Sequence, residues 1–361
     1  MNTSKIVHII EASATGTLSM AALLANCQAS NGHVVSVIYS QRPETPVDFI
    51  THFDRSINLI NIQMSSALER LTCLPKIRST LKSLSPDCVF MHSSFAGFLG
   101  RLSTLGALAH TKNFYLPHCI SFMRNDIGSL KKVLFVFFEW LASIKNADYV
   151  ACSESERRAI ARSIPFRKCH LVENALDFKA IPSMNQQDLS HRKKTVITVG
   201  QIRPQKGPDF FSSIAQAVKT EAPQIEFVWV GDGDANARQQ LEDSGVHVIG
   251  WVPKSQVWQY LADARLYLST AQWEGMPVSV IEASFAGLPV VASSCAGNVD
   301  VVAHGETGWL FKTPAEATES ILSSLENPES SQSIAKAAFD IARQRFSVER
   351  YYQEMEFLIQ S

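Results

Sequence analysis

Several patterns that define common protein classes are missing from this chain of 361 residues. Its seven cysteines include no C-x-x-C pair, which argues against a zinc cluster or a disulfide framework and fits a reducing compartment. The ten histidines form no H-E-x-x-H motif, so no metal site is predicted. No segment reaches about 18 uninterrupted apolar residues, so no membrane-spanning helix is expected. The N-terminal residues run directly into a strand-like pattern, unlike a signal peptide.

Two motifs of common enzymes are also absent. The dinucleotide-binding pattern G-x-G-x-x-G is missing after the first expected strand, where Gly16 is the only glycine, and this counts against a dehydrogenase. Ser153 also follows a strand-like run, but no G-x-S-x-G elbow surrounds it. We therefore expect Ser153 to cap a helix over 154–163.

The chain has no strong excess of either charge, with a net charge of −1, which argues against wholesale nucleic-acid binding. The charge is nevertheless uneven. Residues 1–178 hold 18 Lys+Arg and 13 Asp+Glu, whereas residues 179–361 hold 15 and 21. A basic first half could meet an anionic membrane surface or a phosphorylated acceptor. Ordinary scatter of charge explains the difference equally well.

Short β-branched runs alternate with helical segments, a pattern typical of a parallel sheet covered by helices. The first such unit comprises a strand over Lys5–Ile10, a helix over about 18–30 and a strand over Val34–Tyr39. The alternation then continues through segments 88–92, 95–108, 114–117, 148–153 and 154–163. The predicted fold class is α/β, with two Rossmann-like doubly wound domains.

The alternating pattern fails over 178–194, which is polar, contains proline and lacks periodicity. We therefore expect a first domain over 1–178, a linker over 179–194 and a second domain over 195–345. A C-terminal helix over 346–361 is expected to pack back on the first domain. Two doubly wound domains imply a deep cleft between them, which is the usual place for a ligand.

The helix expected over 130–145 is unusually apolar and carries Lys131, Lys132 and Lys145 at its ends. It could lie in a membrane interface. It could instead be a core helix that is apolar on all sides, and we favour this core interpretation.

A candidate anion site begins at the turn Glu274-Gly275-Met276-Pro277, which follows a short apolar strand and precedes a helix. Pro277 suits the first helical position. The N–H groups of Val278 to Val280 would then lack partners and would favour a phosphate. Glu274 precedes this site, and Glu282 lies about two turns into the helix.

A second candidate is the loop 200–207, G-Q-I-R-P-Q-K-G, which joins a strand to a helix. Its cations, Arg203 and Lys206, suit a diphosphate, although a solvated basic loop would look the same in isolation. Because parallel strands end at one edge of a sheet, we expect this loop to lie near Glu274.

Two weaker candidates accompany these sites. The sequence Asp232-Gly233-Asp234 resembles a metal-binding D-x-D, but a turn needs the same residue types and is the favoured interpretation. His118 follows a short strand and should lie in a loop at the edge of the cleft.

Taken together, these motifs resemble the retaining glycosyltransferases of the GT-B fold, in the E-x7-E class similar to glycosyltransferase family 4. The resemblance covers nearly the whole chain. It is carried by segments 199–207, 230–234, 249–253, 274–282, 286–293 and 305–310. In the first half, Gly16, the His118 loop and A-C-S-E-S-E-R at 151–157 also fit.

The resemblance implies a role for each candidate residue. Glu282 would bind the ribose, and Glu274 would face the donor sugar near its 3- and 4-hydroxyls. Arg203 and Lys206 would neutralise the departing diphosphate. The further donor-binding or catalytic positions would be Gly16 near the phosphates or acceptor, His118 at the sugar, Trp251 and Val252 at the base, and Met276, Val278 and Ser279 at the turn and helix start.

Two departures from the family pattern affect these assignments. The family usually has arginine where this chain has Gln201, so the position of Arg203 would differ. The family often has Asn-Gly near the end of the first domain, where this chain has Asn174-Ala175.

The resemblance therefore implies a metal-independent, retaining hexosyltransferase that needs no cofactor. The donor substrate would be a UDP-hexose or UDP-N-acetylhexosamine. The acceptor would be a glycan or a lipid-diphosphate in bacterial surface polysaccharide or O-antigen synthesis. The enzyme would be cytoplasmic, with peripheral contact to the inner membrane, and would not bind nucleic acid. A UDP-sugar 2-epimerase of the same fold and a non-catalytic sugar-nucleotide binding protein remain alternatives.

Overall fold

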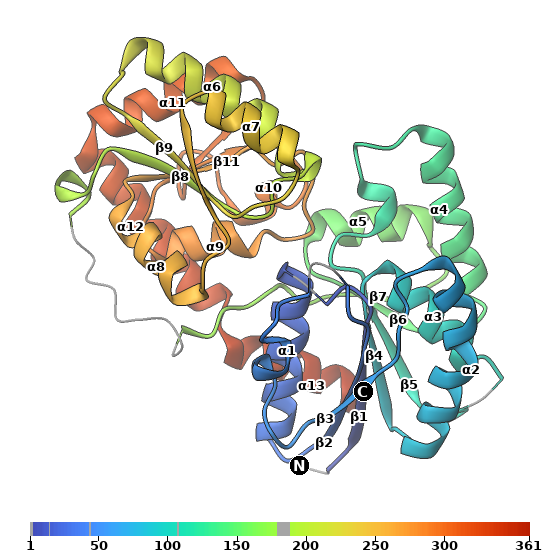
Figure 1. Cartoon of the computed structure of the whole chain (residues 1–361). Helices are drawn as coiled ribbons and strands as arrows, with labels where there is room; N and C mark the ends of the chain where they lie inside the picture. The colour runs from blue at the N-terminus through green and yellow to red at the C-terminus, as the bar shows by residue number, and fades with distance from the viewer. Residues whose placement is uncertain (1–2, 14, 43–44, 107, 179–187) are drawn as a thin grey trace. The chain divides into compact units, whose positions relative to one another are not determined.

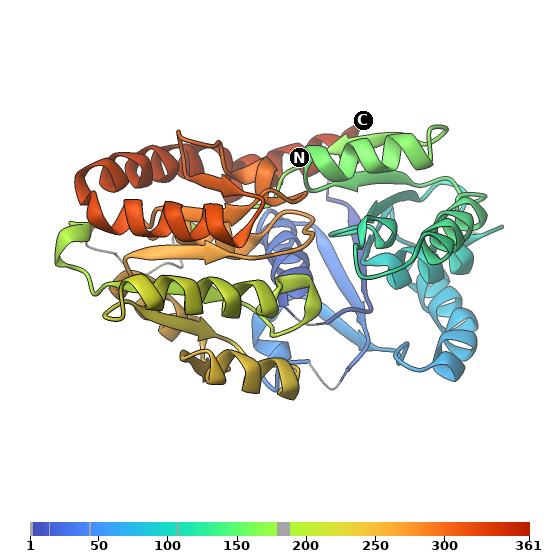
Figure 2. The same ribbon diagram turned by 90° about the horizontal axis from the view of Figure 1, so that it is seen from above.

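The computed structural model describes residues 3–13, 15–42, 45–106, 108–178 and 188–361. The chain divides into two compact units, each built on its own parallel sheet. The first unit comprises Met1–Asn174 and Val348–Ser361, and the second comprises Ala175–Ser347. In each unit, helices lie on both sides of the sheet, as Figures 1 and 2 show. The predicted α/β class with two Rossmann-like units is therefore confirmed.

The first unit contains a seven-stranded parallel sheet in the order β3-β2-β1-β4-β5-β6-β7. Its strands are β1 (Lys5–Ile10), β2 (Val34–Tyr39), β3 (Asn58–Asn61), β4 (Cys88–His92), β5 (Lys112–Leu116), β6 (Asp148–Ala151) and β7 (Cys169–Leu171). Its helices are α1 (Thr15–Ser30), α2 (Ala67–Leu84), α3 (Ser94–Thr104), α4 (Ser129–Ala142), α5 (Glu154–Ser163) and α13 (Val348–Gln360). Apolar side chains of α1 form one core with the sheet, and those of α2 and α3 form another.

The second unit contains a six-stranded parallel sheet in the order β10-β9-β8-β11-β12-β13. Its strands are β8 (Thr195–Val199), β9 (Glu226–Val230), β10 (Val246–Gly250), β11 (Leu266–Ser269), β12 (Val290–Ser293) and β13 (Trp309–Phe311). Its helices are α6 (Pro208–Glu221), α7 (Ala235–Asp243), α8 (Lys254–Asp263), α9 (Val278–Phe285), α10 (Asn298–Val301), α11 (Pro314–Glu326) and α12 (Pro328–Arg345). Buried side chains of α6, α7 and α11 share one core with the sheet.

The division between the units falls four residues before the expected boundary at 178. Leu176 pairs with Ser347, and Phe178 stacks on Phe285, so both residues belong to the second unit. Of the expected linker, residues 179–187 lie outside the described residues. The segment after them is held to the second unit, because Leu189 is buried and its N–H donates to Gln332.

The final helix, α13, returns to the first unit and packs beside α1 (Figure 1). The Lys112 ammonium donates to the carbonyl of Ile359 at 2.8 Å. His33 lies 3.2 Å from the carboxylate of Glu356. These contacts join residues more than 240 positions apart in the chain.

The structure overturns the core interpretation of helix 130–145. Only Glu139 and Ala142 of α4 are buried, and Phe135 and Val136 reach the core partly. The remaining large apolar side chains face solvent: Leu130, Val133, Leu134, Phe137, Phe138, Trp140 and Leu141, followed by Ile144 just beyond the helix. Phe98 packs edge-on against Phe138, and Phe166 against Trp140, but all eight side chains remain 41–84% exposed. In the described part of the chain, no helix is both long and apolar enough to cross a bilayer.

Smaller features have local causes. Pro328 begins α12 directly after Asn327, which follows the end of α11. The turn before β13 leads into a strand that pairs in parallel with β12. Helix α1 begins before the expected start, so Gly16 lies in its first turn.

Candidate functional site

The loop that follows β8 is held against the loop that follows β11. The hydroxyl of Thr270 donates to the carbonyl of Lys206 at 2.8 Å, and the N–H of Gln272 donates to the carbonyl of Gln205 at 2.8 Å. Gly207 has a φ of +64°, and a Cβ there would lie 2.2 Å from the carbonyl oxygen of Thr270. Only glycine permits this backbone approach. The predicted proximity of the basic loop to the Glu274 turn is therefore confirmed.

The loop after β9 supports the basic loop from its other side. A Cβ on Gly231 or Gly233 would lie 2.1 Å from the carbonyl oxygen of Gly200 or Ile202, respectively. The neighbouring aspartates have structural partners. Asp232 pairs with Arg238 at 2.7 Å, and the carboxylate of Asp234 caps α7. Among the described residues, no group of three or more His, Cys, Asp or Glu side chains could hold a metal ion.

Lys206 and Glu274 form an ion pair at the meeting point of the two loops. Lys206 Nζ lies 2.9 Å from Glu274 Oε1, and Gln205 Nε2 donates to Glu274 Oε2 at 3.0 Å. Glu274 is buried. Burial is the largest single influence on the Lys206 ammonium and would lower its pKa, but the charges of Glu274 and Tyr267 and the hydrogen bond to Glu274 together outweigh burial and raise the pKa. Lys206 therefore carries its positive charge at neutral pH.

Gly297 sets the backbone position of Glu274. The N–H of Glu274 donates to the carbonyl of Ala296, and a Cβ on Gly297 would lie 2.5 Å from Glu274 Cβ. Gly297 also has a φ of +87°. The chain passes so close here that only glycine fits behind the carboxylate.

We expect Gly297→Ala to lower the free energy of unfolding by about 2–4 kcal/mol, since left-handed strain and overlap with Glu274 add together. Gly305→Ala is the matched control. Gly305 has a φ of +79° and no atom within 4 Å of its Cβ position, so it reports strain alone, about 1–2 kcal/mol. Thermal unfolding of both variants measures the difference. If Gly297→Ala and Gly305→Ala lost the same free energy of unfolding, the overlap with Glu274 would contribute nothing to the loss.

The start of α9 offers unpaired polar groups beside Glu274. In the described structure, the N–H groups of Val278 and Ser279 have no partner, and the Ser279 hydroxyl is buried without one. The N–H of Val280 donates to Pro277, which corrects the prediction that it is free. Pro277 precedes the helix instead of occupying its first position. Two N–H groups at the positive end of a helix remain for an anion.

Arg203 lies in the same loop as Lys206. It forms no ion pair with any described residue, and its Nε is buried without a partner. Its positive charge acts to lower the pKa of the Lys206 ammonium, against the raising effect of Glu274. An anion with two charges would relieve their repulsion.

Glu282 is buried in α9 and pairs with Lys254 at the start of α8. The sequence analysis did not identify Lys254. Its side chain is 58% exposed, whereas that of Glu282 is 3% exposed, so Lys254 is the mobile partner and a ligand that displaces it must give Glu282 a new hydrogen-bond donor. Trp251 and Val252 lie between β10 and α8; Trp251 is exposed and Val252 is half-buried. Met276 is buried in the turn before α9. Glu282, Lys254 and Trp251 therefore all lie near strand ends of the second sheet.

His118 and Gly16 belong to the first unit. His118 and Cys119 both have positive φ, +54° and +94°. Buried Glu156 holds this strained loop, because one of its oxygens accepts from the N–H groups of Cys119 and Ile120 at 2.8 Å each. Ser153 accepts from the N–H of Glu156, which confirms its predicted capping role. Gly16 is exposed, and a Cβ there would meet nothing within 4 Å.

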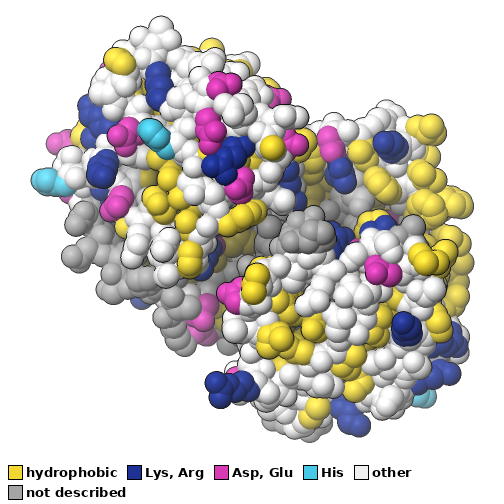
Figure 3. All heavy atoms as spheres, in the orientation of Figure 1, with side chains coloured by type: hydrophobic (Ala, Val, Ile, Leu, Met, Phe, Trp, Pro, Cys, Tyr) yellow, Lys and Arg dark blue, Asp and Glu magenta, His cyan; other side chains and the backbone are white. Residues whose placement is uncertain are grey.

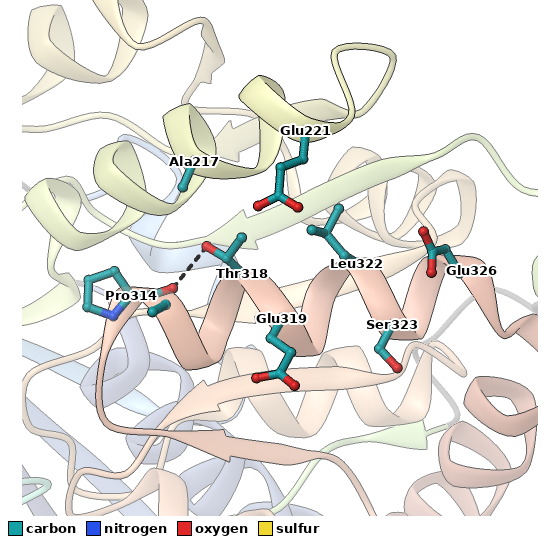
Figure 4. Close-up of a pocket in the computed structure, with 9 residues that line it drawn as sticks. Ala217, Glu221, Pro314, Thr318, Glu319, Leu322, Ser323 and Glu326 are labelled. Atoms are coloured by element: carbon teal, nitrogen blue, oxygen red, sulfur yellow. Dashed lines mark hydrogen bonds between the residues drawn. The ribbon is translucent and has the colours of Figure 1, made fainter.

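One hollow in the second unit lies away from these residues (Figure 4). It has a volume of about 630 Å³ and lies between α6 and α11. None of the predicted site residues lines it. Its charged lining consists of Glu221, Glu319 and Glu326, which would repel an anionic ligand.

Comparison with known proteins gives two family matches that together span most of the chain. Residues 15–179 match the model described as Glycosyltransferase Family 4, and residues 181–340 match Glycosyl transferases group 1. One relative is an uncharacterized 41.2 kDa protein in the cps region of Klebsiella pneumoniae, with 27% identity over 84% of this chain and 85% of the relative. Another is the Escherichia coli UDP-Gal:alpha-D-GlcNAc-diphosphoundecaprenol alpha-1,3-galactosyltransferase, with 27% identity over 70% and 68%.

Solved structures with the same fold include Alr3699/HepE of Anabaena in complex with UDP. Its TM-score is 0.78 at 19% identity, over 99% of both chains. A sucrose-phosphate synthase from Thermosynechococcus elongatus has a TM-score of 0.81 at 17% identity, over 99% of this chain and 98% of the other. At these identities the likeness concerns the fold.

Proposed function

Because the chain belongs to the family 4-like glycosyltransferases of the GT-B fold, we propose that it transfers a sugar with retention from a UDP-sugar. The donor is a UDP-hexose or a UDP-N-acetylhexosamine, and the acceptor is a glycan or lipid-diphosphate in bacterial surface polysaccharide or O-antigen synthesis. The cluster of Lys206, Arg203, Glu274 and the open N–H groups of α9 carries this proposal.

The proposed roles follow from how charge moves during the reaction. Breaking the bond between sugar and diphosphate leaves positive charge on the sugar and negative charge on the departing phosphate. Lys206, Arg203 and the N–H groups of Val278 and Ser279 stabilise the phosphate without having to reorganise, which is usually the largest contribution to catalysis. They supply the positive charge that a metal ion would otherwise provide, and we therefore propose a metal-independent reaction.

Glu274 and Glu282 have separate proposed roles. Glu274 accepts hydrogen bonds from the donor sugar. Glu282 accepts from the ribose hydroxyls when Lys254 moves aside. Trp251 and Val252 contact the base. Gln201 carries no charge, so the second cationic role is assigned to Arg203.

Two named proteins support the choice of substrates. The Escherichia coli relative is named for UDP-galactose as donor and a diphosphoundecaprenol-linked acceptor. HepE has been solved with UDP-glucose. The seven free cysteines fit a protein that acts on the cytoplasmic side of the membrane.

Release of UDP tests the proposal. The protein is incubated with UDP-glucose, UDP-galactose and their N-acetylated forms, with and without a lipid-diphosphate acceptor, and with EDTA in a parallel set. We expect UDP release from one donor, retained with EDTA, and an anomeric configuration in the product that matches the donor. A 2-epimerase would convert the donor without glycosyl transfer, and a binding protein would hold it unchanged. Either result would overturn the proposed transfer.

The outer face of α4 supports contact with an anionic membrane surface. It presents seven large apolar side chains, and Figure 3 shows apolar side chains gathered along the edge where Figure 1 places this helix. Lys131, Lys132 and Lys145 accompany them, whereas the only acidic side chain of the helix, Glu139, is buried. Apolar and aromatic side chains flanked by lysines suit the headgroup region of an anionic bilayer. A lipid-linked acceptor would be reached from this position.

We expect Phe137→Glu to weaken binding to vesicles of phosphatidylethanolamine and phosphatidylglycerol by about tenfold or more. Phe137 is 58% exposed, and insertion of its ring into the bilayer contributes about 1.5–3 kcal/mol to the free energy of binding. A glutamate would lose this contribution, because the anionic headgroups repel its carboxylate. Co-sedimentation measures the partition. Phe357→Glu is the control, because Phe357 is 70% exposed on α13 of the same unit. Equal binding by both variants and the unmodified protein would argue against α4 as the contact surface.

A further inference from the structure

Three histidines form a continuous hydrogen-bonded chain inside the first unit. His8 Nδ1 lies 2.9 Å from His92 Nε2, and His92 Nδ1 lies 3.0 Å from His118 Nε2. His8 and His92 stand on the neighbouring strands β1 and β4, and His118 follows β5. Side chains two residues apart on a strand share a face, so the sheet brings the three rings into one row. His8 and His92 are fully buried.

Gln28 of α1 closes the inner end of this row. Its Oε1 lies 2.7 Å from His8 Nε2, and Gln28 is fully buried. In this amide orientation the oxygen of Gln28 accepts, so His8 Nε2 carries the proton, and Gln28 Nε2 is buried without a partner in the described structure. His8 Nδ1 then accepts from His92 Nε2–H, and His92 Nδ1 accepts from His118 Nε2–H. At the outer end, His118 Nδ1 is left as an unprotonated acceptor.

The hydrogen bonds of the row keep this donor-to-acceptor order, with an acceptor at His118 Nδ1, only while all three rings are neutral. A neutral imidazole has one donor and one acceptor, whereas an imidazolium has two donors and would break the row. Burial lowers the pKa of His8 to about 4 and that of His118 to about 4. Burial also lowers the pKa of His92 well below its ordinary value, and the other two histidines lower it further. All three rings are therefore neutral at pH 7.

We propose that Gln28, acting through His8 and His92, fixes His118 in the Nε2–H tautomer, so that His118 Nδ1 accepts a hydrogen bond from a donor-sugar hydroxyl. The assignment of the sugar rests on the function proposed above. Among the described residues, the hydrogen bond of the His118 ring is the one that Nε2 makes with His92, so Nδ1 is the nitrogen left for a ligand. Gln28, His8 and His92 are positioning residues, and of the four residues in this row only His118 touches the sugar.

The loop geometry supports this role. His118 adopts a positive φ, which is uncommon for a histidine, and Glu156 holds the two N–H groups that follow it. The backbone therefore fixes where the ring stands, while Gln28 fixes which ring nitrogen accepts. A hydroxyl that meets this acceptor must donate, which selects its orientation.

Nitrogen-15 spectra of histidine-labelled protein test the tautomer directly, with His118→Asn used to assign the signal. At pH 7 and without substrate, we expect His118 to show a protonated Nε2 and an unprotonated Nδ1. Gln28→Met keeps the volume but removes the acceptor, and should give a mixture of tautomers. Leu24→Met, a buried change elsewhere on α1, should retain the single tautomer. A protonated Nδ1 in the unmodified protein, or no change in Gln28→Met, would overturn the proposal.

Kinetics provide the second measurement. With the donor found by UDP release, Gln28→Met should lower kcat/KM about three- to tenfold, as expected for loss of one hydrogen bond. Leu24→Met, a buried change elsewhere on α1, is the packing control. The spectra need no donor, so failure of the proposed transfer would leave their result intact. If Gln28→Met gave mixed tautomers but an unchanged kcat/KM, the claim that His118 Nδ1 accepts a hydrogen bond from the sugar would be wrong.

Discussion

Replacing Lys206 by methionine is expected to lower kcat by about 10²–10³-fold. Methionine fills a similar space but cannot balance the charge that develops on the departing diphosphate, and loss of one such preorganised group typically has an effect of this size. The measurement is UDP release under saturating donor. Because the same change leaves buried Glu274 without its cation, stability must be followed in parallel.

Two further variants separate catalysis from stability. The double change Lys206→Met with Glu274→Gln removes both charges, so it should recover stability without recovering turnover. Lys312→Met removes an exposed lysine of the same unit and should leave both properties unchanged. If Lys206→Met turned over at the unmodified rate, the diphosphate role of Lys206 would be wrong, whatever the stability data showed.

The second large effect is expected in the first unit, where Glu139→Gln should lower the free energy of unfolding by about 3–5 kcal/mol. Arg101 is fully buried and donates to Glu139 Oε2 at 2.7 Å, while the hydroxyls of Tyr115 and Tyr149 also donate to this carboxylate. The change leaves the guanidinium charge buried and unpaired. Urea unfolding, monitored by hydrogen exchange in peptides from α3 and α4, measures the loss of unfolding free energy in this unit.

An exposed ion pair provides the matched control for this prediction. Glu154 pairs with Arg157 and Arg158 on the surface of α5, and Glu154→Gln should change stability by less than about 1 kcal/mol. Adding Arg101→Met to Glu139→Gln removes the unpaired charge and should recover most of the loss. A similar small loss in Glu139→Gln and Glu154→Gln would mean that water reaches Arg101.

Local pattern was sufficient to predict much of the framework. The bounds of β1, β2, β4 and α5 agree with the sequence analysis, because each is a short run of uniform character between clear breaks. The meeting of the Lys206 loop with the Glu274 turn also followed from the sequence. Strand ends of a parallel sheet share an edge, so topology alone brings those two loops together.

Other features depended on side-chain reach and on distant neighbours. The pairing of Glu282 with Lys254 depends on where α8 lies, and no local pattern indicates this. The histidine row joins positions 8, 92 and 118, which only the order of the strands aligns. Helix α4 is apolar on most of its surface, so its composition could not show whether another element covers it.

The return of α13 to the first unit determines the order in which the molecule can be completed. A ribosome delivers the second unit, Ala175–Ser347, before the helix that finishes the first. At about 5–20 residues per second, these 173 residues take roughly 9–35 s to synthesise. During that time α1 lacks its neighbour and His33 lacks Glu356. The unit that begins the chain is therefore the last to close, and nascent chains stalled before Val348 would expose the surface that α13 later covers.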